Sequence, residues 1–288
     1  MENYSHTTPP VAPGRQGQPF APGDAVLLLD PATDRIYEVN LRPGATFQTQ
    51  KSGLVKHDAI IGLGDGARVA TNLGGQFICL RPTLEDHLLR LPRRTQILFA
   101  KDLGLILLKA NLHPGAKILE AGIGSGSLAT TLLHHLGPSG HLISYEIREE
   151  FARLALRNLA TARERLGSSG ARHTVRLHNI YESIVDEDLD TIFLDVPEPA
   201  RVLPHAVKAL RPGGVFMAWL PTALQVYELV RALQEDPHFT FVETTETLQR
   251  PWEVAPNSVR PAHRMVAHTG FLIRARRVEP APAAGPGG

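Results

Sequence analysis

A strand, a glycine loop and a helix start, in that order, constrain the fold of this chain more than any other feature. The segment runs from Ile118 to Leu128, and its loop contains Gly122, Gly124 and Gly126. Glycine adopts positive φ and lets a ligand approach the backbone closely. Open α/β sheets bind ligands in such loops, at the carboxyl end of a parallel strand. The segment therefore predicts a ligand-binding βα unit, although a tight turn without a ligand would use the same glycines.

Strand and helix patterns alternate from residue 117 onward, which predicts a parallel sheet with helices on both faces. Strands are expected at 117–121, 141–146, 174–178, 191–196 and 215–220, and helices at 125–136, 149–166, 201–210 and 222–235. Two more strands, at 239–248 and 269–278, complete the sheet. The last strand returns without a helix, so it must be antiparallel to its partner. We therefore expect an α/β fold with a Rossmann-like sheet and an antiparallel last strand.

The region before this sheet has a different pattern, in which short strands are separated by turn residues. Strands are expected at 25–29, 35–40, 45–49, 58–61, 68–71 and 76–80, and together they predict a small β-barrel-like domain. Thr83, followed by Asp86, can cap a short helix that ends near Leu91, and Asp102 can cap another that ends before His113.

The predicted domain boundaries follow from these patterns. The expected organisation is a disordered tail (1–20), the small β domain (21–82), the larger α/β domain (83–279) and a second tail (280–288).

Composition excludes several classes of protein. Among the 288 residues the single cysteine, Cys79, cannot form an intrachain disulfide, and no apolar run approaches the roughly 18 residues of a membrane helix. The amino-terminal residues also lack the apolar stretch of a signal peptide. We therefore expect a cytoplasmic protein without a membrane partner. No bound metal is expected either.

The net charge of +1, from 30 Lys and Arg against 29 Asp and Glu, argues at first against a nucleic-acid partner. The charges are distributed unevenly, however. Residues 147–176 contain seven arginines, 177–200 contain seven acids and no Lys or Arg, and 250–277 contain six arginines and one acid. Such runs are usually solvated faces. Their arrangement is also that of an acidic site between two surfaces suited to phosphate.

Two carboxylates limit the choice of cofactor. Glu146 lies 20 residues after Gly126, at the end of the next expected strand, where it can accept both hydroxyl protons of a ribose. The loop also matches the G-x-G-x-x-A dinucleotide pattern, so NAD is an alternative. Glu120 would repel a pyrophosphate but attract a cationic amino-acid tail, which favours S-adenosylmethionine. A water-facing glutamate at the strand end is the alternative for Glu120.

Further residues are candidates for the base and for the reacting end of the site. Asn179 and Ile180, after the third expected strand, are placed to contact the adenine, and Phe151 could flank it or belong to the core. Asp195 ends the strand 191–196 before a proline-rich turn that would hold its carboxylate toward the crevice. A capping role in the loop is the alternative for Asp195.

The motifs together resemble one known family. They include Arg94-Thr95-Gln96-Ile97, Leu119-Glu120-Ala121-Gly122, Ser144-Tyr145-Glu146, Leu194-Asp195, Glu198-Pro199, Leu220-Pro221-Thr222, Arg260-Pro261 and His268-Thr269-Gly270-Phe271-Leu272. In their order and spacing, over roughly 50–278, they resemble the bacterial and archaeal homotetrameric tRNA (adenine-N1)-methyltransferases that modify adenosine 58 of the T loop.

This resemblance implies a set of functional residues. Asp195 is the expected catalytic residue, because its carboxylate would accept a hydrogen bond from the adenine N6 amine. The residues expected to bind S-adenosylmethionine are Thr95, Gln96, Glu120, Gly122, Gly124, Ser125, Gly126, Ser127, Leu128, Glu146, Phe151, Asn179, Ile180 and Asp195. The residues expected to bind tRNA are Arg260, Arg264, His268 and Arg276.

The resemblance also implies a homotetramer built as a dimer of dimers. Two departures stand out: the family's Tyr-Pro before Lys-Asp is Phe99-Ala100 here, and Asn179 stands where the family has Asp at or beside that position.

Three other functions remain open on the sequence. They are methyl transfer to a protein carboxylate, as in the isoaspartate repair enzymes, an NAD-dependent oxidoreductase, and a non-catalytic RNA-binding subunit. The retained Gly122, Gly124, Gly126, Glu146 and Asp195 argue against the last of these.

Overall fold

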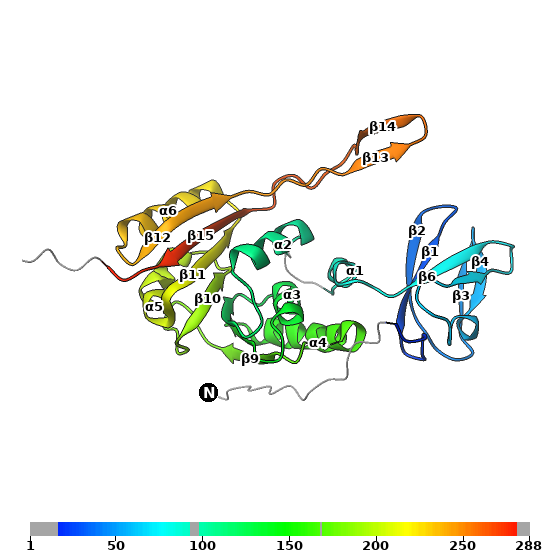
Figure 1. Ribbon diagram of the computed structural model, residues 1–288, viewed down its shortest axis with the longest axis horizontal. Helices are drawn as coiled ribbons and strands as arrows, with labels where there is room; N and C mark the ends of the chain where they lie inside the picture. Colours follow the sequence, from blue (N-terminus) through cyan, green and yellow to red (C-terminus); the bar gives the residue numbers. More distant parts are fainter. Residues whose placement is uncertain (1–16, 93–97, 168, 281–288) are drawn as a thin grey trace, which may run out of the picture. The chain divides into compact units, whose positions relative to one another are not determined.

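The computed structural model describes residues 17–92, 98–167 and 169–280, in which the chain forms two compact units (Figure 1). Among the described residues, the larger unit contains 92, 98–159 and 169–280, and the smaller contains 17–91 with 160–167. The expected tails lie outside the described residues, except for 17–20 and 280. No helix of the described segments has both the length and the apolar character that crossing a membrane requires.

The larger unit is built on a seven-stranded sheet in the order β12-β15-β11-β10-β7-β8-β9. The strands are β7 (Lys117–Ala121), β8 (His141–Glu146), β9 (Arg172–Leu177), β10 (Leu189–Leu194), β11 (Leu210–Leu220), β12 (Phe239–Thr245) and β15 (Phe271–Arg277). From β7 to β11 the neighbours are parallel, and β15 is antiparallel to both β11 and β12, as predicted.

The strand order creates a crevice at the carboxyl ends of the central strands of this sheet. The chain builds β7, β8 and β9 outward in one direction and then returns to place β10 on the other side of β7. The connections on either side of β7 therefore diverge, and open α/β sheets bind their ligands at such a point.

Helices cover both faces of the sheet (Figure 1). They are α2 (Ala100–Lys109), α3 (Ser127–His135), α4 (Glu149–Leu166), α5 (Leu203–Ala209) and α6 (Ala223–Glu235), with a 3-10 turn, η2 (Pro199–Val202), before α5. One apolar core joins alternate sheet residues such as Leu119, Ile143 and Ile192 to Leu203 of α5 and Leu229 of α6.

One expected cap is wrong. Phe99, not Asp102, is the N-cap residue of α2, and Asp102 lies in its first turn. The Asp102 side chain is turned into the interior, where Lys101 and Thr269 donate hydrogen bonds to it. An interior partner therefore holds this carboxylate away from the helix end.

The sequence did not predict the strands β13 (Trp252–Ala255) and β14 (Ser258–Pro261). They form an antiparallel hairpin that extends from the ends of β12 and β15 (Figure 1). All four residues of β13 are exposed, so the hairpin lacks the alternation of buried and exposed residues that marks a strand at a sheet surface. We call residues 246–270, between β12 and β15, the arm.

The smaller unit contains a four-stranded sheet in the order β2-β1-β6-β5 and a separate pair, β3-β4. The strands are β1 (Ala25–Asp30), β2 (Arg35–Asn40), β3 (Thr46–Thr49), β4 (Gly53–Lys56), β5 (Arg68–Ala70) and β6 (Gln76–Leu80). Phe20, Val26, Leu28, Leu41 and Phe77 are among the residues of its own apolar core.

The strand expected at 58–61 is wrong. His57–Ala59 form a 3-10 turn, and the strand lies earlier, at β4. The turn is fixed by side chains, because the Asp58 carboxylate accepts the Gly44 N–H at 3.1 Å and His57 Nδ1 accepts the Arg42 N–H at 3.0 Å.

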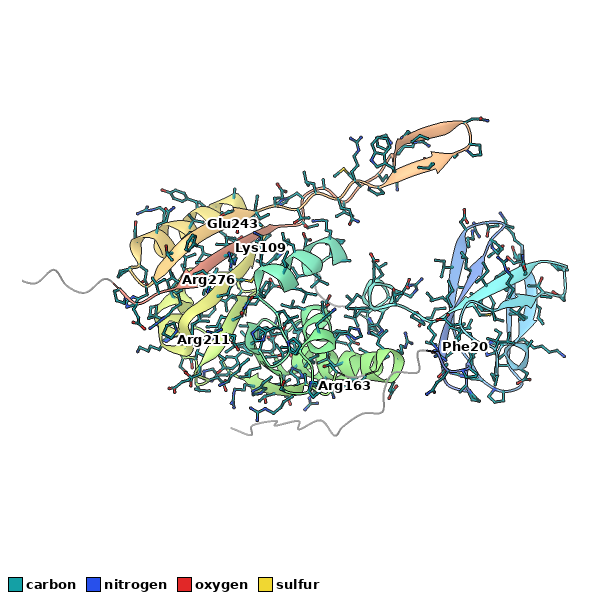
Figure 2. The ribbon with its side chains drawn as sticks, viewed as in Figure 1. Phe20, Lys109, Arg163, Arg211, Glu243 and Arg276 are labelled. Atoms are coloured by element: carbon teal, nitrogen blue, oxygen red, sulfur yellow. The ribbon has the colours of Figure 1, made fainter. Side chains whose placement is uncertain are left out.

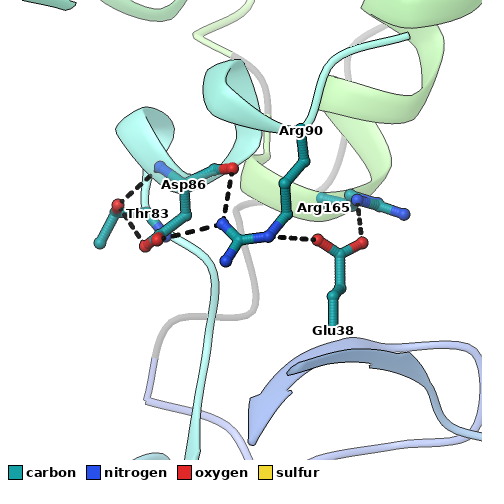
Figure 3. Close-up of polar contacts among 5 residues, drawn as sticks. All are labelled: Glu38, Thr83, Asp86, Arg90 and Arg165. Carbon is teal, nitrogen blue, oxygen red and sulfur yellow. Dashed lines mark hydrogen bonds and ion pairs between the residues drawn. The ribbon is translucent and has the colours of Figure 1, made fainter. Parts of the chain in front are cut away.

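The predicted cap at Thr83 is confirmed. Thr83 and Asp86 form a reciprocal capping box at the start of α1 (Leu84–Leu89), and Glu38 of β2 contacts Arg90 at 3.6 Å and Arg165 at 2.7 Å (Figure 3). These ion pairs join β2, the end of α1 and the last turns of α4 within the smaller unit.

Candidate active site

A cavity of about 360 Å³ opens at the carboxyl ends of β7, β8, β10 and β11. Its lining includes seven of the residues predicted from the sequence, namely Gly122, Gly124, Ser125, Ser127, Leu128, Glu146 and Asp195. The strand order thus brings together carboxylates that are about 50 residues apart in the sequence.

The glycine loop requires Gly122 and Gly126 for different reasons. Gly122 has φ +88°, and a Cβ there would lie 2.3 Å from the Asp195 carbonyl oxygen. Gly126 has φ +82° and is the N-cap residue of α3, and a Cβ there would lie 3.3 Å from the Ala155 side chain. The first glycine lets the loop lie against the turn after β10, and the second lets α3 begin close to α4.

Glu146 is buried, with 4% of its surface exposed, and its carboxylate is oriented by the backbone. Oε1 accepts the N–H groups of Ile147 and Arg148, both at 3.0 Å. Oε2 has no hydrogen-bond partner among the described residues. A buried acceptor without a partner is costly, so this oxygen is suited to a ligand hydroxyl. Ser127 Oγ, also buried, has no partner in the described part of the chain either.

Asp195 lies where the turn after β10 meets the cavity. Its backbone N–H donates to the Ala121 carbonyl at 2.9 Å, which fixes the residue beside the end of β7. The residue is exposed to solvent and lines the cavity together with Glu146. Burial, with a smaller contribution from Glu146, raises the pKa of Asp195 to about 6. The group is therefore a carboxylate at neutral pH but is protonated in mild acid.

Glu120 is 2% exposed and does not line the cavity, so the water-facing interpretation of this residue is wrong. Ser144 Oγ donates to its Oε1 at 2.6 Å, and the same hydroxyl lies 2.8 Å from His173 Nε2. Burial, followed by the charges of Asp195 and Glu146, raises the pKa of Glu120 to about 8, against the effect of the Ser144 hydrogen bond. At neutral pH Glu120 is mostly protonated in the free protein.

Three candidates for the adenine end lie outside the lining of the cavity. Asn179 is held in a local turn, because its side chain bonds to Glu182 and to the Tyr181 N–H. Ile180 belongs to the apolar core. Phe151 contacts the lining residue Arg148, whose guanidinium carbon lies 3.9 Å from the centre of the Phe151 ring.

Thr95 and Gln96, the candidates for the methionine end, lie outside the described residues.

The sequence interpretation missed part of the cavity wall, which Leu98, Trp219, Pro221 and Gln225 form. Gln225 Nε2 donates to the Pro197 carbonyl at 3.1 Å and so braces the turn after Asp195. Gly270 could have indicated a close neighbour at this point, because a Cβ there would lie 2.6 Å from the indole ring of Trp219.

The structure separates the four candidates for tRNA binding. Arg260 pairs with Glu253 across the β13-β14 hairpin, Arg264 has no partner in the part of the chain described, and His268 lies at the base of the arm. Arg276 pairs with Val215 in the sheet register, five residues before the cavity end of β11, and donates to the Gly213 carbonyl at 2.9 Å (Figure 2). The structure therefore places Arg276 at the end of the sheet opposite the cavity, near the amino ends of the parallel strands.

The described residues contain no group of three or more His, Cys, Asp or Glu placed to hold a metal ion.

The sheet with its antiparallel last strand, the glycine loop and the strand-end carboxylates define a Rossmann-like class I S-adenosylmethionine-dependent methyltransferase. The sequence profile described as "tRNA methyltransferase complex GCD14 subunit" matches residues 75–269, and one described as "TrmI-like N-terminal" matches 19–69. The protein belongs to the GCD14/TrmI family.

Relatives support this membership along most of the chain. A Thermus thermophilus protein named tRNA (adenine(58)-N(1))-methyltransferase TrmI is 36% identical over 87% of this chain and 96% of its own. The solved structure of the Aquifex aeolicus tRNA (m1A58) methyltransferase TrmI aligns with a TM-score of 0.77 and 30% identity, over 91% of this chain and all of that one. A Thermotoga maritima structure described as a SAM-dependent O-methyltransferase aligns with a TM-score of 0.82 and 34% identity, over 92% and 96%.

Proposed function

We propose that this protein transfers a methyl group from S-adenosylmethionine to N1 of adenosine 58 in the T loop of tRNA. The observation that carries the proposal is the cavity with Asp195 and Glu146 at the ends of β10 and β8, the two strands that flank β7, in a chain whose family and relatives are named for tRNA methylation. The smaller unit supports the same assignment through its match to the amino-terminal region of this family.

The residues of the cavity fit S-adenosylmethionine. Glu146 Oε2 is a buried acceptor available to a ribose hydroxyl, and the loop from Gly122 to Leu128 leaves room for a ligand beside its backbone. When bound, the cofactor supplies an electrophilic methyl group on a sulfonium. Glu120, which is mostly protonated in the free protein, would ionise beside the ammonium group of the bound cofactor. Thr95 and Gln96 are proposed to bind the same end. Phe151, Asn179 and Ile180 are proposed for the adenine end.

Asp195 is the proposed catalytic residue. Adenine N1 already carries a lone pair at neutral pH, so this chain need not supply a strong base. The carboxylate accepts a hydrogen bond from the N6 amine of the target base, which turns N1 toward the methyl group and balances the positive charge that develops on the base. Orientation of this kind accounts for roughly 7–11 kcal/mol of barrier in favourable cases.

Access to adenosine 58 requires the enzyme to open the folded elbow of tRNA and extrude the base. Arg264, which has no partner within the described residues, and Arg260, on the hairpin, are the proposed phosphate contacts. Of the seven acids in 177–200, Asp195 alone lines the cavity. Asp186 pairs with Arg176 and Asp190 with Arg211, so the expectation that this acidic run forms the site is wrong.

A cytoplasmic homotetramer is the proposed assembly. Three apolar side chains of the β13-β14 hairpin, Trp252, Val254 and Val259, are exposed in the single chain, and a second copy of the same chain is the proposed cover. Replacing Trp252 by Glu is expected to lower the mass measured by light scattering, whereas an unchanged mass would locate the interface elsewhere.

The test is mass spectrometry of nucleosides from unmodified tRNA incubated with the protein and S-adenosylmethionine. The expected product is N1-methyladenosine. Mapping the modified nucleotide to position 58 or 57 would locate it in the T loop. If no methylated adenosine forms, the proposal is wrong.

Methyl transfer to a carboxylate oxygen is the second candidate, since the Thermotoga maritima relative is described as an O-methyltransferase. An isoaspartyl peptide in the same assay tests it. An oxidoreductase is tested by thermal shift with NAD against S-adenosylhomocysteine.

A further inference from the structure

His268 occupies the base of the arm, where both of its ring nitrogens contact oxygen acceptors. Nδ1 lies 2.7 Å from Oε1 of Glu246, and Nε2 lies 2.9 Å from the carbonyl oxygen of Pro221. A backbone carbonyl has no proton to donate, and an ionised carboxylate has none either. Two good hydrogen bonds therefore require a proton on each nitrogen, which makes His268 an imidazolium cation.

These two bonds connect three parts of the larger unit. Glu246 lies where the chain leaves β12 for the arm, His268 lies where the arm returns toward β15, and Pro221 lines the cavity. The ring of Phe271 lies 4.9 Å from the imidazole and limits its position. His268 thus ties both strands of the arm to the wall of the active-site cavity.

A second set of contacts at the same base does not include His268. Lys101 Nζ donates to Asp102 at 2.8 Å, to the Thr247 carbonyl at 2.7 Å and to Thr269 Oγ1 at 2.8 Å. This buried group fixes both arm strands to α2. Deprotonation of His268 therefore frees the arm from Pro221 while the arm remains attached at Lys101.

We propose that His268 is a positioning residue that acts as a protonation-dependent latch, holding the arm against the Pro221 wall so that RNA contacts on the arm stay in register with the cavity. The RNA part of this inference rests on the proposed function. The latch itself is a property of the free protein.

The charged groups around His268 determine the direction of its response to pH. Glu246 in the arm favours the cation, Lys101 in α2 opposes it, and the loop before α6 contributes the neutral carbonyl of Pro221. The Pro221 and Glu246 hydrogen bonds raise the pKa of His268 above its ordinary value of 6.5. The latch is therefore closed below pH 6.5 and opens as the pH rises through the raised pKa.

The first experiment measures hydrogen exchange of peptides covering residues 246–269 in the free protein, from pH 6 to 9. The variants are His268→Arg, which keeps two donors and a charge at every pH, and His268→Gln, which cannot donate to both oxygens. Comparing the proteins at each pH removes the intrinsic effect of pH on exchange.

Wild type is expected to match His268→Arg at pH 6 and His268→Gln at pH 9, with about a fivefold change in arm exchange between the two states, the effect of one hydrogen bond. The control is His263→Gln, another exposed histidine of the arm, which should behave as wild type throughout. Exchange in wild type that equals that of His268→Arg at every pH would overturn the latch.

The second experiment measures KM and kcat for tRNA over the same range. His268→Gln is expected to raise KM for tRNA about fivefold at pH 6 with little change in kcat, and His268→Arg is expected to retain the low KM at pH 9. If the exchange results hold and KM does not change, the arm is latched but does not position RNA. If no variant methylates tRNA, the proposed function and the RNA part of this inference fail, and the exchange result alone decides on the latch.

Discussion

The glycine-loop wall of the cavity and the base of the arm differ in how the sequence builds them. The wall comes from one continuous segment, β7 with its loop and the start of α3, and from a carboxylate at the end of the next strand. The base of the arm joins α2 to segments 146 and 168 residues away through Lys101, and it reaches Pro221 through His268. A sequence motif can therefore reveal the cavity wall, whereas the base of the arm can be recognised only in the folded chain.

The difference is also electrostatic. Beside the cavity, burial raises the pKa values of Glu120 and Asp195, and the negative charge of Glu146 adds to both shifts. At the base of the arm each charge is paired with an opposite charge, as in Lys101 with Asp102 and His268 with Glu246. The wall is arranged to receive a cation, whereas the base of the arm already contains its own cations and serves to hold structure.

The largest expected effect is on stability and comes from the base of the arm. Lys101→Met leaves Asp102 as a buried charge without its partner, and we expect it to lower the free energy of unfolding by about 3–5 kcal/mol. Lys109→Met, in the same helix, breaks the exposed pair with Glu243 and should cost about 1 kcal/mol or less (Figure 2). Urea unfolding measures both. Equal losses would show that the Lys101 group does not fasten the arm.

Asp195→Ala should lower kcat for methyl transfer about 100- to 1000-fold while cofactor affinity stays near that of wild type. Wild-type activity should also fall as the pH drops through about 6, the pKa of Asp195, because the protonated group no longer offers a full negative charge to the N6 amine. Single-turnover rates and calorimetric titration with S-adenosylhomocysteine separate the two quantities. Near-normal turnover in the variant would remove Asp195 from the mechanism.

Gly122→Ala tests the contact between the loop and the turn after β10. Its Cβ would lie 2.3 Å from the Asp195 carbonyl oxygen, so the backbone must shift, and we expect cofactor affinity to fall at least about tenfold. Gly62→Ala is the matched control, because Gly62 has φ +91° but no atom within 4 Å of the added Cβ. The control should cost about 1 kcal/mol in stability and leave cofactor affinity unchanged. Normal affinity in Gly122→Ala would show that the loop tolerates a side chain.

Glu120→Gln should make stability less sensitive to alkali. The pKa of Glu120 is raised to about 8, so folding favours its neutral form. Stability from this group is complete below the unfolded value of 4.5 and is lost as the pH rises through about 8. We expect the variant to be more stable than wild type at pH 8, by an amount on the order of 2 kcal/mol, and similar at pH 4.5. Thermal unfolding of both proteins at pH 8 and pH 4.5 measures the difference. If the variant and wild type differ in stability by the same amount at both pH values, the pKa of Glu120 is an ordinary one.

The smallest effect concerns RNA affinity. Arg264→Ala should reduce the slope of log affinity against log salt concentration by about 1, because one phosphate contact is lost. Arg276→Ala should leave the slope unchanged, because Arg276 lies at the far edge of the sheet, bonded to Gly213. Filter binding of tRNA at several salt concentrations measures both slopes. If Arg276→Ala reduces the slope and Arg264→Ala does not, the RNA-binding surface lies at the end of the sheet that contains Arg276.

Local patterns predicted much of the larger unit. The strands 117–121 and 141–146 and the helix 149–166 have the same bounds in the structure, because their apolar periodicity is strong and their flanking residues stop each element clearly. The place of Glu146 at the cavity could be predicted from its spacing alone, since it lies at the carboxyl end of a predicted strand. At 58–61 the apolar pattern predicted a strand, but side-chain hydrogen bonds hold a 3-10 turn there. In the β13-β14 hairpin no residue is buried, so no apolar face could reveal these strands.

The sequence by itself determined the alternating strands and helices of the parallel part of the large sheet, the glycine loop and the family to which the chain belongs. Tertiary structure decided which residues share the cavity, so that Trp219, Pro221 and Gln225 line it and Asn179, Ile180 and Phe151 do not. It also decided the protonation of Glu120 and His268. Burial and hydrogen-bond partners set a pKa, and both depend on segments that meet only when the chain is folded.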